Sequence, residues 1–119
     1  GGSPEYRTFS LENMFLGFPA QFENGHAVHQ ALSELNAGDC VHLVSMGRDG
    51  LGLTDAFGRA VARLSHQGVS EWQPRVQAIR ELRVLAIIRR TAEQSDAEFQ
   101  SGCRVAEWEV PLVESVLNR

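Results

Sequence analysis

Histidine and cysteine are the side chains of this sequence best suited to hold a metal ion. His26 and His29 stand three residues apart in a segment with helical spacing, so both rings could face the same way. Together with His42, Cys40 or Cys103 they could bind zinc. Zinc sites usually show two close ligand pairs, whereas this sequence has one. One surface histidine and one partly buried histidine explain the same spacing, so we expect no metal site.

The same cysteines are candidate nucleophiles, with His42 or His66 as the base. No local signature accompanies either thiol, and Cys40 falls in an expected strand, where a small buried apolar residue is the simpler interpretation. Two cysteines are too few for a disulfide framework, which favours reduced thiols and a cytoplasmic location. A single Cys40–Cys103 disulfide is the alternative.

Carboxylates and glycines also give no catalytic arrangement. Glu107 and Glu109 could act as an acid and a base, but their spacing of two is what one solvated face of a strand produces. Gly50-Leu51-Gly52 lacks the later glycine that a dinucleotide-binding turn needs. We therefore expect no enzymatic activity in this domain and no cofactor.

Arginine shows an uneven distribution along the chain. Residues 75–90 contain five arginines and one acid, a local net charge of +4, so with a total of −4 the rest carries −8. Such a contrast is typical of a nucleic-acid contact on an otherwise acidic domain. Trp72, just before this stretch, could stack on a base. The candidate nucleic-acid-binding residues are therefore Trp72, Arg75, Arg80, Arg83, Arg89 and Arg90.

Ion pairing within a sheet is the competing interpretation of these arginines. In a strand, Arg83 and Arg89 share a face, as do Glu107 and Glu109 in the last expected strand. If the two strands pair, the arginines are cross-strand partners of the glutamates, and Trp72 covers the end of the core.

The composition fits one globular domain. The chain has 119 residues, of which 43% are hydrophobic and 22% charged, and all 11 cations are arginine. The acidic balance excludes a uniformly basic coat and a polybasic membrane anchor, and no apolar run approaches a membrane-spanning length. Residues 1–3 resemble a cloning remnant without an initiator methionine, so we expect residues 4–119 to be an excised single module.

The hydrophobic pattern predicts a mainly β (α+β) fold. Apolar residues with a helical period predict one main helix over residues 26–35, with Asn24 as its cap. Ser95 and Glu98 fit a capping box and predict a short helix ending at Gly102. Expected strands cover residues 6–18, 39–46, 51–54, 60–64, 82–90 and 105–113, and residues 67–74 read as a loop. Six short strands with glycine turns indicate a small six-stranded β-barrel or sandwich.

Three segments resemble a known family. The segments HAVHQALSELNAGDCVHLV, GLGLTDAFGRAVARLS and RVLAIIRRTAEQSDAEFQSGCRVAEWEVPLVE are similar to the C-terminal accessory region of large bacterial RecQ-type ATP-dependent DNA helicases. The likeness spans residues 11–114. The matching residues are Leu35, Gly38, Asp39, Val41, Leu43, Asp55, Gly58, Val61, Leu64, Arg89, Arg90, Asp96, Trp108, Glu109 and Val110.

The middle part also resembles HIRAN domains, small β-barrels attached to helicases and nucleases and associated with gripping single-stranded DNA ends. Both share a Leu-x-x-Gly-Asp-x-Val-x-Leu segment, here starting at Leu35, followed by Gly-x-x-Val-x-x-Leu from Gly58. The Asn-Pro-x-Asp-x-Asn-Ala segment of that family is absent, and residues 47–55 stand in its place.

These resemblances imply a non-catalytic accessory domain of an ATP-dependent helicase, with ATP hydrolysis in other parts of the parent protein. The expected partners are single-stranded DNA, bound weakly, and the helicase core, with no membrane contact and a monomeric isolated domain. The alternative is a protein-interaction or interdomain packing module without DNA contact, docking through Phe15, Phe18 and Phe22.

Overall fold

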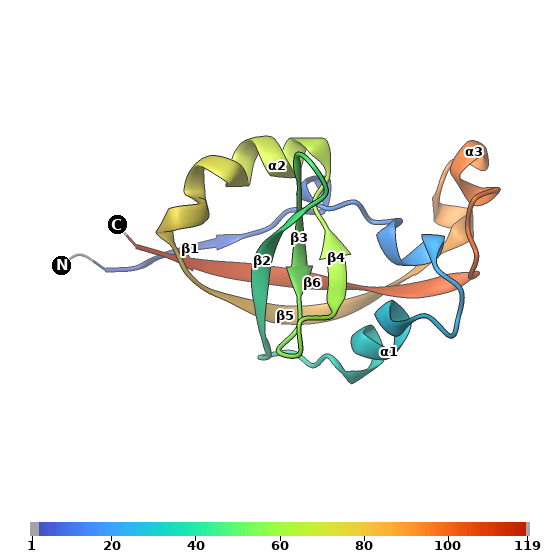
Figure 1. Cartoon of the computed structure of the whole chain (residues 1–119), viewed down its shortest axis with the longest axis horizontal. Helices are drawn as coiled ribbons and strands as arrows, with labels where there is room; N and C mark the ends of the chain where they lie inside the picture. Colours follow the sequence, from blue (N-terminus) through green and yellow to red (C-terminus); the bar gives the residue numbers. More distant parts are fainter. Residues whose placement is uncertain (1–2, 119) are drawn as a thin grey trace.

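Six antiparallel strands form one sheet in the order β1-β6-β5-β2-β3-β4 (Figure 1). This computed structural model describes residues 3–118, so Gly1 and Gly2 of the expected cloning remnant lie outside it. The strands are β1 (Glu5–Thr8), β2 (Cys40–Met46), β3 (Gly50–Thr54), β4 (Ala60–Arg63), β5 (Ile79–Thr91) and β6 (Glu107–Leu117). The predicted mainly β class with six strands is confirmed.

The sheet is not closed into a barrel, because no ladder among the described residues joins its outer strands β1 and β4. The chain that follows β1 crosses between them instead. Phe9 N–H donates to Val113 O of β6 (2.9 Å), and Phe15 N–H donates to Arg63 O of β4 (2.8 Å). Of the two architectures considered, the open-sheet or sandwich form is the one observed.

The predicted first strand over residues 6–18 is correct only for β1. Two short 3-10 helices follow it, η1 (Leu11–Asn13) and η2 (Phe18–Gln21). The buried large apolar side chains of residues 6–18 are Phe9, Met14 and Phe18, whose spacing fits neither strand alternation nor a single helix face. Residues 9–18 form an irregular segment that covers the core between β1 and β4, and this explains the spacing.

Strands β5 and β6 form the longest pairing and run the length of the molecule (Figure 1). The predicted strand over 105–113 continues past Pro111, which lies opposite Ile87. Ala92 N–H donates to Ala106 O (2.9 Å), so these two residues form a hydrogen-bonded pair of the ladder. Hydrogen-bonded and non-hydrogen-bonded pairs alternate along antiparallel strands, and the pair of Ile87 with Pro111 is therefore one without hydrogen bonds. The strand β1 starts to pair with β6 only at Glu114, so proline costs no ladder bond here.

The main helix is confirmed as α1 (Ala27–Glu34), but its cap is His26 and not Asn24. His26 Nδ1 accepts the Val28 N–H at 3.0 Å, and the imidazole ring stacks on Phe22 with 4.2 Å between centroids. Asn24 lies two residues before this cap, where the chain is still turning.

Removing the His26 cap is expected to cost about 1 kcal/mol of unfolding free energy, the usual effect of losing an N-cap acceptor. His26→Ala should show this loss in urea unfolding followed by circular dichroism. His26→Asn restores an acceptor and should recover most of the stability. An asparagine variant as unstable as the alanine variant would show that the contact with Phe22, and not the cap, is what matters.

A second helix occupies the segment predicted as loop over residues 67–74. It is α2 (His66–Trp72), which continues into the 3-10 helix η3 (Gln73–Ala78). Ser65 caps it by accepting the Gly68 N–H at 3.0 Å. The helix is short and has a glycine near its centre, so its sequence has a weak helix propensity. Burial of Trp72 against Phe9 holds it in place, with 3.9 Å between stacked ring centroids.

The predicted short helix is α3 (Ala97–Gln100), preceded by the 3-10 turn η4 (Ala92–Gln94). Its cap is Asp96 and not Ser95, because Asp96 Oδ1 accepts the Phe99 N–H at 2.8 Å. This helix lies on a projection at the far end of β5 and β6 (Figure 1). Within residues 3–118, no helix has the length and apolar character needed to span a bilayer.

Candidate nucleic-acid interface

Two of the predicted DNA-binding arginines form ion pairs on the sheet. Arg89 Nη1 lies 2.9 Å from Glu107 Oε2 on β6, and the Arg89 backbone lies opposite Glu109. Arg83 Nε lies 3.0 Å from Glu81 Oε1 on its own strand. The ion-pair interpretation is therefore confirmed for Arg89, whereas Arg83 pairs within β5 and not with β6.

Trp72 does not offer a ring to a base, so that part of the prediction is wrong. Only 2% of the residue is exposed, its ring stacks on Phe9, and Nε1 donates to Asn13 Oδ1 at 3.3 Å. Arg75 lies beside it, with its guanidinium 5.5 Å from the ring centroid and Nη1 donating to Glu71 O. The alternative interpretation of Trp72 as a cover of the core is the correct one.

The other two candidates differ in their surroundings. Arg80 is exposed on β5, and no ion pair to it is found among the described residues. Arg90 is half-buried, and its Nη2 donates to Gln94 O at 3.3 Å. Its Nε is buried and has no hydrogen-bond partner within residues 3–118. Arg90 lines a cavity beside α3.

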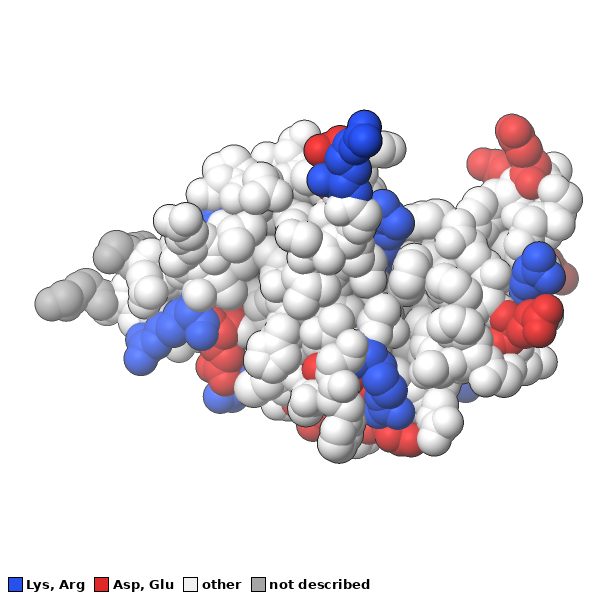
Figure 2. Space-filling view, viewed as in Figure 1, with Lys and Arg blue, Asp and Glu red and all other residues white. Residues whose placement is uncertain are grey.

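A groove with arginines around an apolar floor lies between the β2–β3 turn and the α3 projection (Figure 2). Its larger part is a cavity of about 690 Å³, and a second cavity of about 320 Å³ adjoins it, with Phe15 and Leu16 lining both. We call the two together the arginine groove. It is lined by Met14, Phe15, Leu16, Gly17, Arg48, Asp49, Gly50, Arg63, Leu64, Ser65, His66, Val69, Arg90, Gln94, Ser95, Asp96 and Phe99.

Backbone contacts fix the floor of the arginine groove. Met14 forms an isolated bridge with Leu64, and the Phe15 N–H donates to Arg63 O, so the floor is attached to β4. Phe15 meets Phe99 of α3 edge to face, with 6.0 Å between centroids. Gly50 leaves space for the Arg63 guanidinium, because a Cβ at Gly50 would lie 2.8 Å from Arg63 Nη2.

The arginine groove combines cationic and aromatic groups. Arg48, Arg63 and Arg90 form no ion pair among the described residues, and the carboxylates in the lining are Asp49 and Asp96. A guanidinium can donate two parallel hydrogen bonds to a phosphate. Aromatic rings such as those of Phe15 and Phe99 can stack on bases. This pairing of groups suits single-stranded nucleic acid better than a duplex, whose bases are covered.

Of the predicted site residues, only Arg90 lies in this groove. Arg48 and Arg63 escaped prediction because they come from a turn and a strand end and are not clustered in sequence. The three phenylalanines predicted as a protein-docking surface do not lie on one exposed surface. Phe15 lines the groove, but Phe18 is buried in the core and meets Phe22 edge to face at 5.3 Å.

Four of the candidate metal ligands and nucleophiles have hydrogen-bond partners within the fold, namely His26, His29, Cys40 and Cys103. His26 caps α1, and His29 Nε2 lies 2.8 Å from Phe22 O, so the pair does not face one ligand site. The Cys40 thiol donates to Glu81 Oε1 at 3.4 Å, and this hydrogen bond, with burial and the carboxylate charge, raises the pKa of the thiol. A raised pKa lowers the thiolate fraction that a nucleophile needs. Both cysteines are free thiols in the structure, and Cys40 is exposed, so the interpretation of it as a buried apolar residue is wrong.

Comparisons of the chain with protein-family models, with curated protein sequences and with solved structures find no match.

Proposed function

We propose that this chain is a non-catalytic accessory domain of an ATP-dependent DNA helicase, and that it engages single-stranded DNA through the arginine groove. The observation that carries the proposal is the placement of Arg48, Arg63 and Arg90 around Phe15 and Phe99 in two adjoining cavities. The resemblance to RecQ-type accessory regions and HIRAN domains supports the helicase setting, with ATP hydrolysis elsewhere in the parent protein.

The chemistry of the groove fits a weak and sequence-tolerant contact. Each phosphate held by a guanidinium releases counterions, which gives affinity that falls as salt rises. Stacking on an aromatic side chain contributes about 1–3 kcal/mol per base and accepts any base. The rest of the domain is acidic, so binding is confined to this groove and does not spread over the surface.

The residues that carry the family resemblance do not themselves line the groove, apart from Leu64, Arg90 and Asp96. Gly38 and Gly58 have positive φ at the turns before β2 and before β4, where the backbone requires glycine. These shared residues support a common fold, and the arginine groove supplies the contact with DNA.

Replacing Arg48 and Arg63 together by alanine is expected to weaken binding to a fluorescently labelled single-stranded oligothymidylate by about tenfold or more at low salt. The slope of log affinity against log salt should fall by about 1.4, since each phosphate contact on a single strand contributes about 0.7. Fluorescence anisotropy at several salt concentrations measures both quantities.

The matched control is Arg83→Ala with Arg89→Ala, which also removes two arginines but from sites occupied by ion pairs. We expect this control to bind like the wild type. Absence of binding at low salt, or an equal loss in both double variants, would contradict the groove as the DNA site.

A further inference from the structure

The turn between β3 and β4 presents an aromatic side chain that the fold does not use. Phe57 is 82% exposed, more than Tyr6, Leu11 or Leu85, the other exposed large hydrophobic residues of the described chain. Its ring does not belong to either buried apolar cluster. An exposed aromatic residue at the tip of a turn is of the kind that acts as an anchor in a protein interface.

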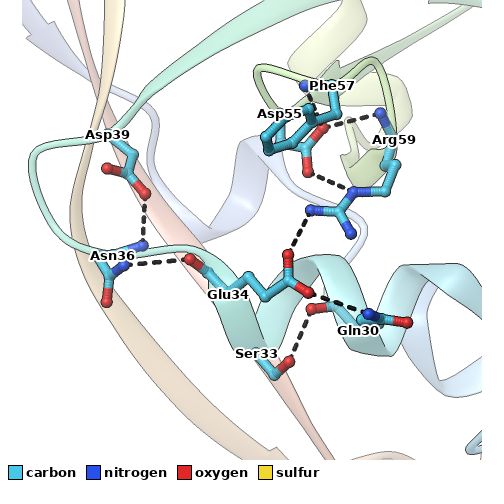
Figure 3. A network of polar contacts seen from close by, with 8 residues as sticks. All are labelled: Gln30, Ser33, Glu34, Asn36, Asp39, Asp55, Phe57 and Arg59. Atoms are coloured by element: carbon cyan, nitrogen blue, oxygen red, sulfur yellow. Dashed lines mark hydrogen bonds and ion pairs between the residues drawn. The ribbon is translucent and has the colours of Figure 1, made fainter.

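The turn that carries Phe57 is held by a buried carboxylate (Figure 3). Asp55 is 5% exposed, and its Oδ1 accepts the N–H groups of both Phe57 and Arg59 at 2.9 Å. Asp55 Oδ2 accepts from Arg59 Nε at 2.8 Å, and Arg59 Nη2 reaches Glu34 of α1 at 2.9 Å. The Arg59 guanidinium lies 5.3 Å from the centroid of the Phe57 ring. A preordered anchor loses little conformational freedom when it binds.

The surface beside Phe57 is acidic. A cavity of about 310 Å³ next to the ring is lined by the exposed carboxylates of Glu34 and Asp39, the buried carboxylate of Asp55 and one cation, Arg59, which pairs with Glu34 and Asp55. A partner surface that receives Phe57 should therefore offer an apolar cavity with positive charge around it.

The arginine groove of this same chain has those properties. Its larger cavity has an apolar floor, and Arg48 and Arg63 line it without ion-pair partners among residues 3–118. The β2–β3 turn at this groove and the β3–β4 turn with Phe57 lie at opposite ends of the same strands (Figure 1). Phe57 therefore cannot reach the groove of its own copy.

We propose that the domain self-associates head to tail, with Phe57 of one copy inserted into the larger cavity of the arginine groove of a second copy. Glu34 and Asp39 of the first copy then face Arg48 and Arg63 of the second. The two contacting surfaces differ, so a pair keeps one free groove on the first copy and one free anchor on the second, and further copies add at both ends to form an open chain. The isolated domain would then not be the monomer that the sequence analysis predicts.

Sedimentation equilibrium of the isolated domain from micromolar to millimolar concentration, without DNA, tests this inference. The wild-type weight-average mass should rise above 13.1 kDa with concentration. Phe57→Ser and Arg63→Glu should each stay monomeric while keeping the wild-type circular dichroism spectrum. Their mixture should form dimers and nothing larger, because only one intact anchor and one intact groove remain.

Leu85→Ser is the matched control, since Leu85 is another exposed apolar residue, 45% exposed, outside both surfaces. It should associate like the wild type. A wild-type mass that stays at the monomer value, an associating Phe57→Ser variant or a monomeric mixture would overturn the proposal. The DNA-binding proposal and the self-association proposal place different occupants in the same groove. If the wild type is monomeric but still binds DNA, only the self-association proposal is overturned.

Discussion

Gly68→Ala is expected to destabilise this domain by about 3 kcal/mol or more, although alanine in a helix usually stabilises by about 1 kcal/mol relative to glycine. Gly68 lies in α2 where the helix touches the backbone of Asn13. A Cβ at this position would overlap the Asn13 carbonyl oxygen and lie 2.8 Å from the carbonyl carbon and 3.0 Å from Cα. Backbone atoms cannot move aside as the end of a flexible side chain can.

Asn13 cannot shift to make room, because its side chain is buried and connects the η1 segment to α2. Its Oδ1 accepts the Ser10 N–H at 3.0 Å and the Trp72 Nε1–H at 3.3 Å, and its Nδ2 donates to Glu71 Oε2 at 2.8 Å. Moving α2 away from Asn13 would break the bonds to Trp72 and Glu71 and separate Trp72 from Phe9. The helix and the segment after β1 are therefore expected to loosen together.

Urea unfolding followed by tryptophan fluorescence measures the loss, since Trp72 is at the affected contact. Gly25→Ala is the control, because a Cβ at Gly25 would have no neighbour within 4 Å. We expect the control to be neutral within about 0.5 kcal/mol, as is usual at surface positions. A Gly68→Ala variant as stable as wild type would show that α2 does not pack on Asn13 in this way.

Asp55→Ala is expected to cost about 3 kcal/mol, because it leaves two backbone N–H groups and the Arg59 Nε–H without their acceptor. Asp55→Asn keeps one acceptor oxygen and loses the charge, so its cost should be smaller, about 1–2 kcal/mol. Differential urea unfolding at pH 7 compares the two variants. Equal stability of wild type and Asp55→Ala would contradict the role of this carboxylate in the turn.

The stability difference between wild type and Asp55→Asn should depend on pH. Burial raises the pKa of Asp55, but the hydrogen bonds from Arg59 and Phe57 outweigh it and hold the pKa below its ordinary value of 3.8. A carboxyl with a lower pKa in the folded state stabilises fully above its unfolded pKa and loses this effect as pH falls through the folded pKa. The difference should therefore be constant near pH 7 and shrink below about pH 4. Glu93→Gln replaces an exposed carboxylate that has no ion-pair partner among residues 3–118, and it should show no such trend.

The parts of the fold that sequence predicts best are those with a strong local period. The meander of β2, β3 and β4 and the helix α1 have alternating or helical apolar spacing and glycines at their turns, and all four elements are found. By contrast, α2 has a central glycine and depends on the contact of Trp72 with Phe9, a residue more than 60 positions away. Tertiary packing of this kind leaves no local signal.

The candidate site was less predictable than the fold for the same physical reason. The five arginines of residues 75–90 stand out in the sequence. In the folded sheet, however, Arg83 and Arg89 form ion pairs, and only Arg90 lines the arginine groove. Arg48 and Arg63 come together only because β3 and β4 run antiparallel and bring the start of one strand beside the end of the other. A groove assembled from separate segments follows from strand order, which sequence did not supply.

The pairing of β1 with β6 has a consequence for synthesis on the ribosome. The Ser115 hydroxyl donates to Arg7 O across 108 positions, so the strand β1 cannot complete its ladder until Leu117 has emerged. Until then Phe9, which ends up buried and whose N–H donates to Val113 O, remains without its contact with the last strand. Contacts of such long range slow folding and prolong the exposure of apolar surface, which is when nascent chains aggregate or recruit chaperones.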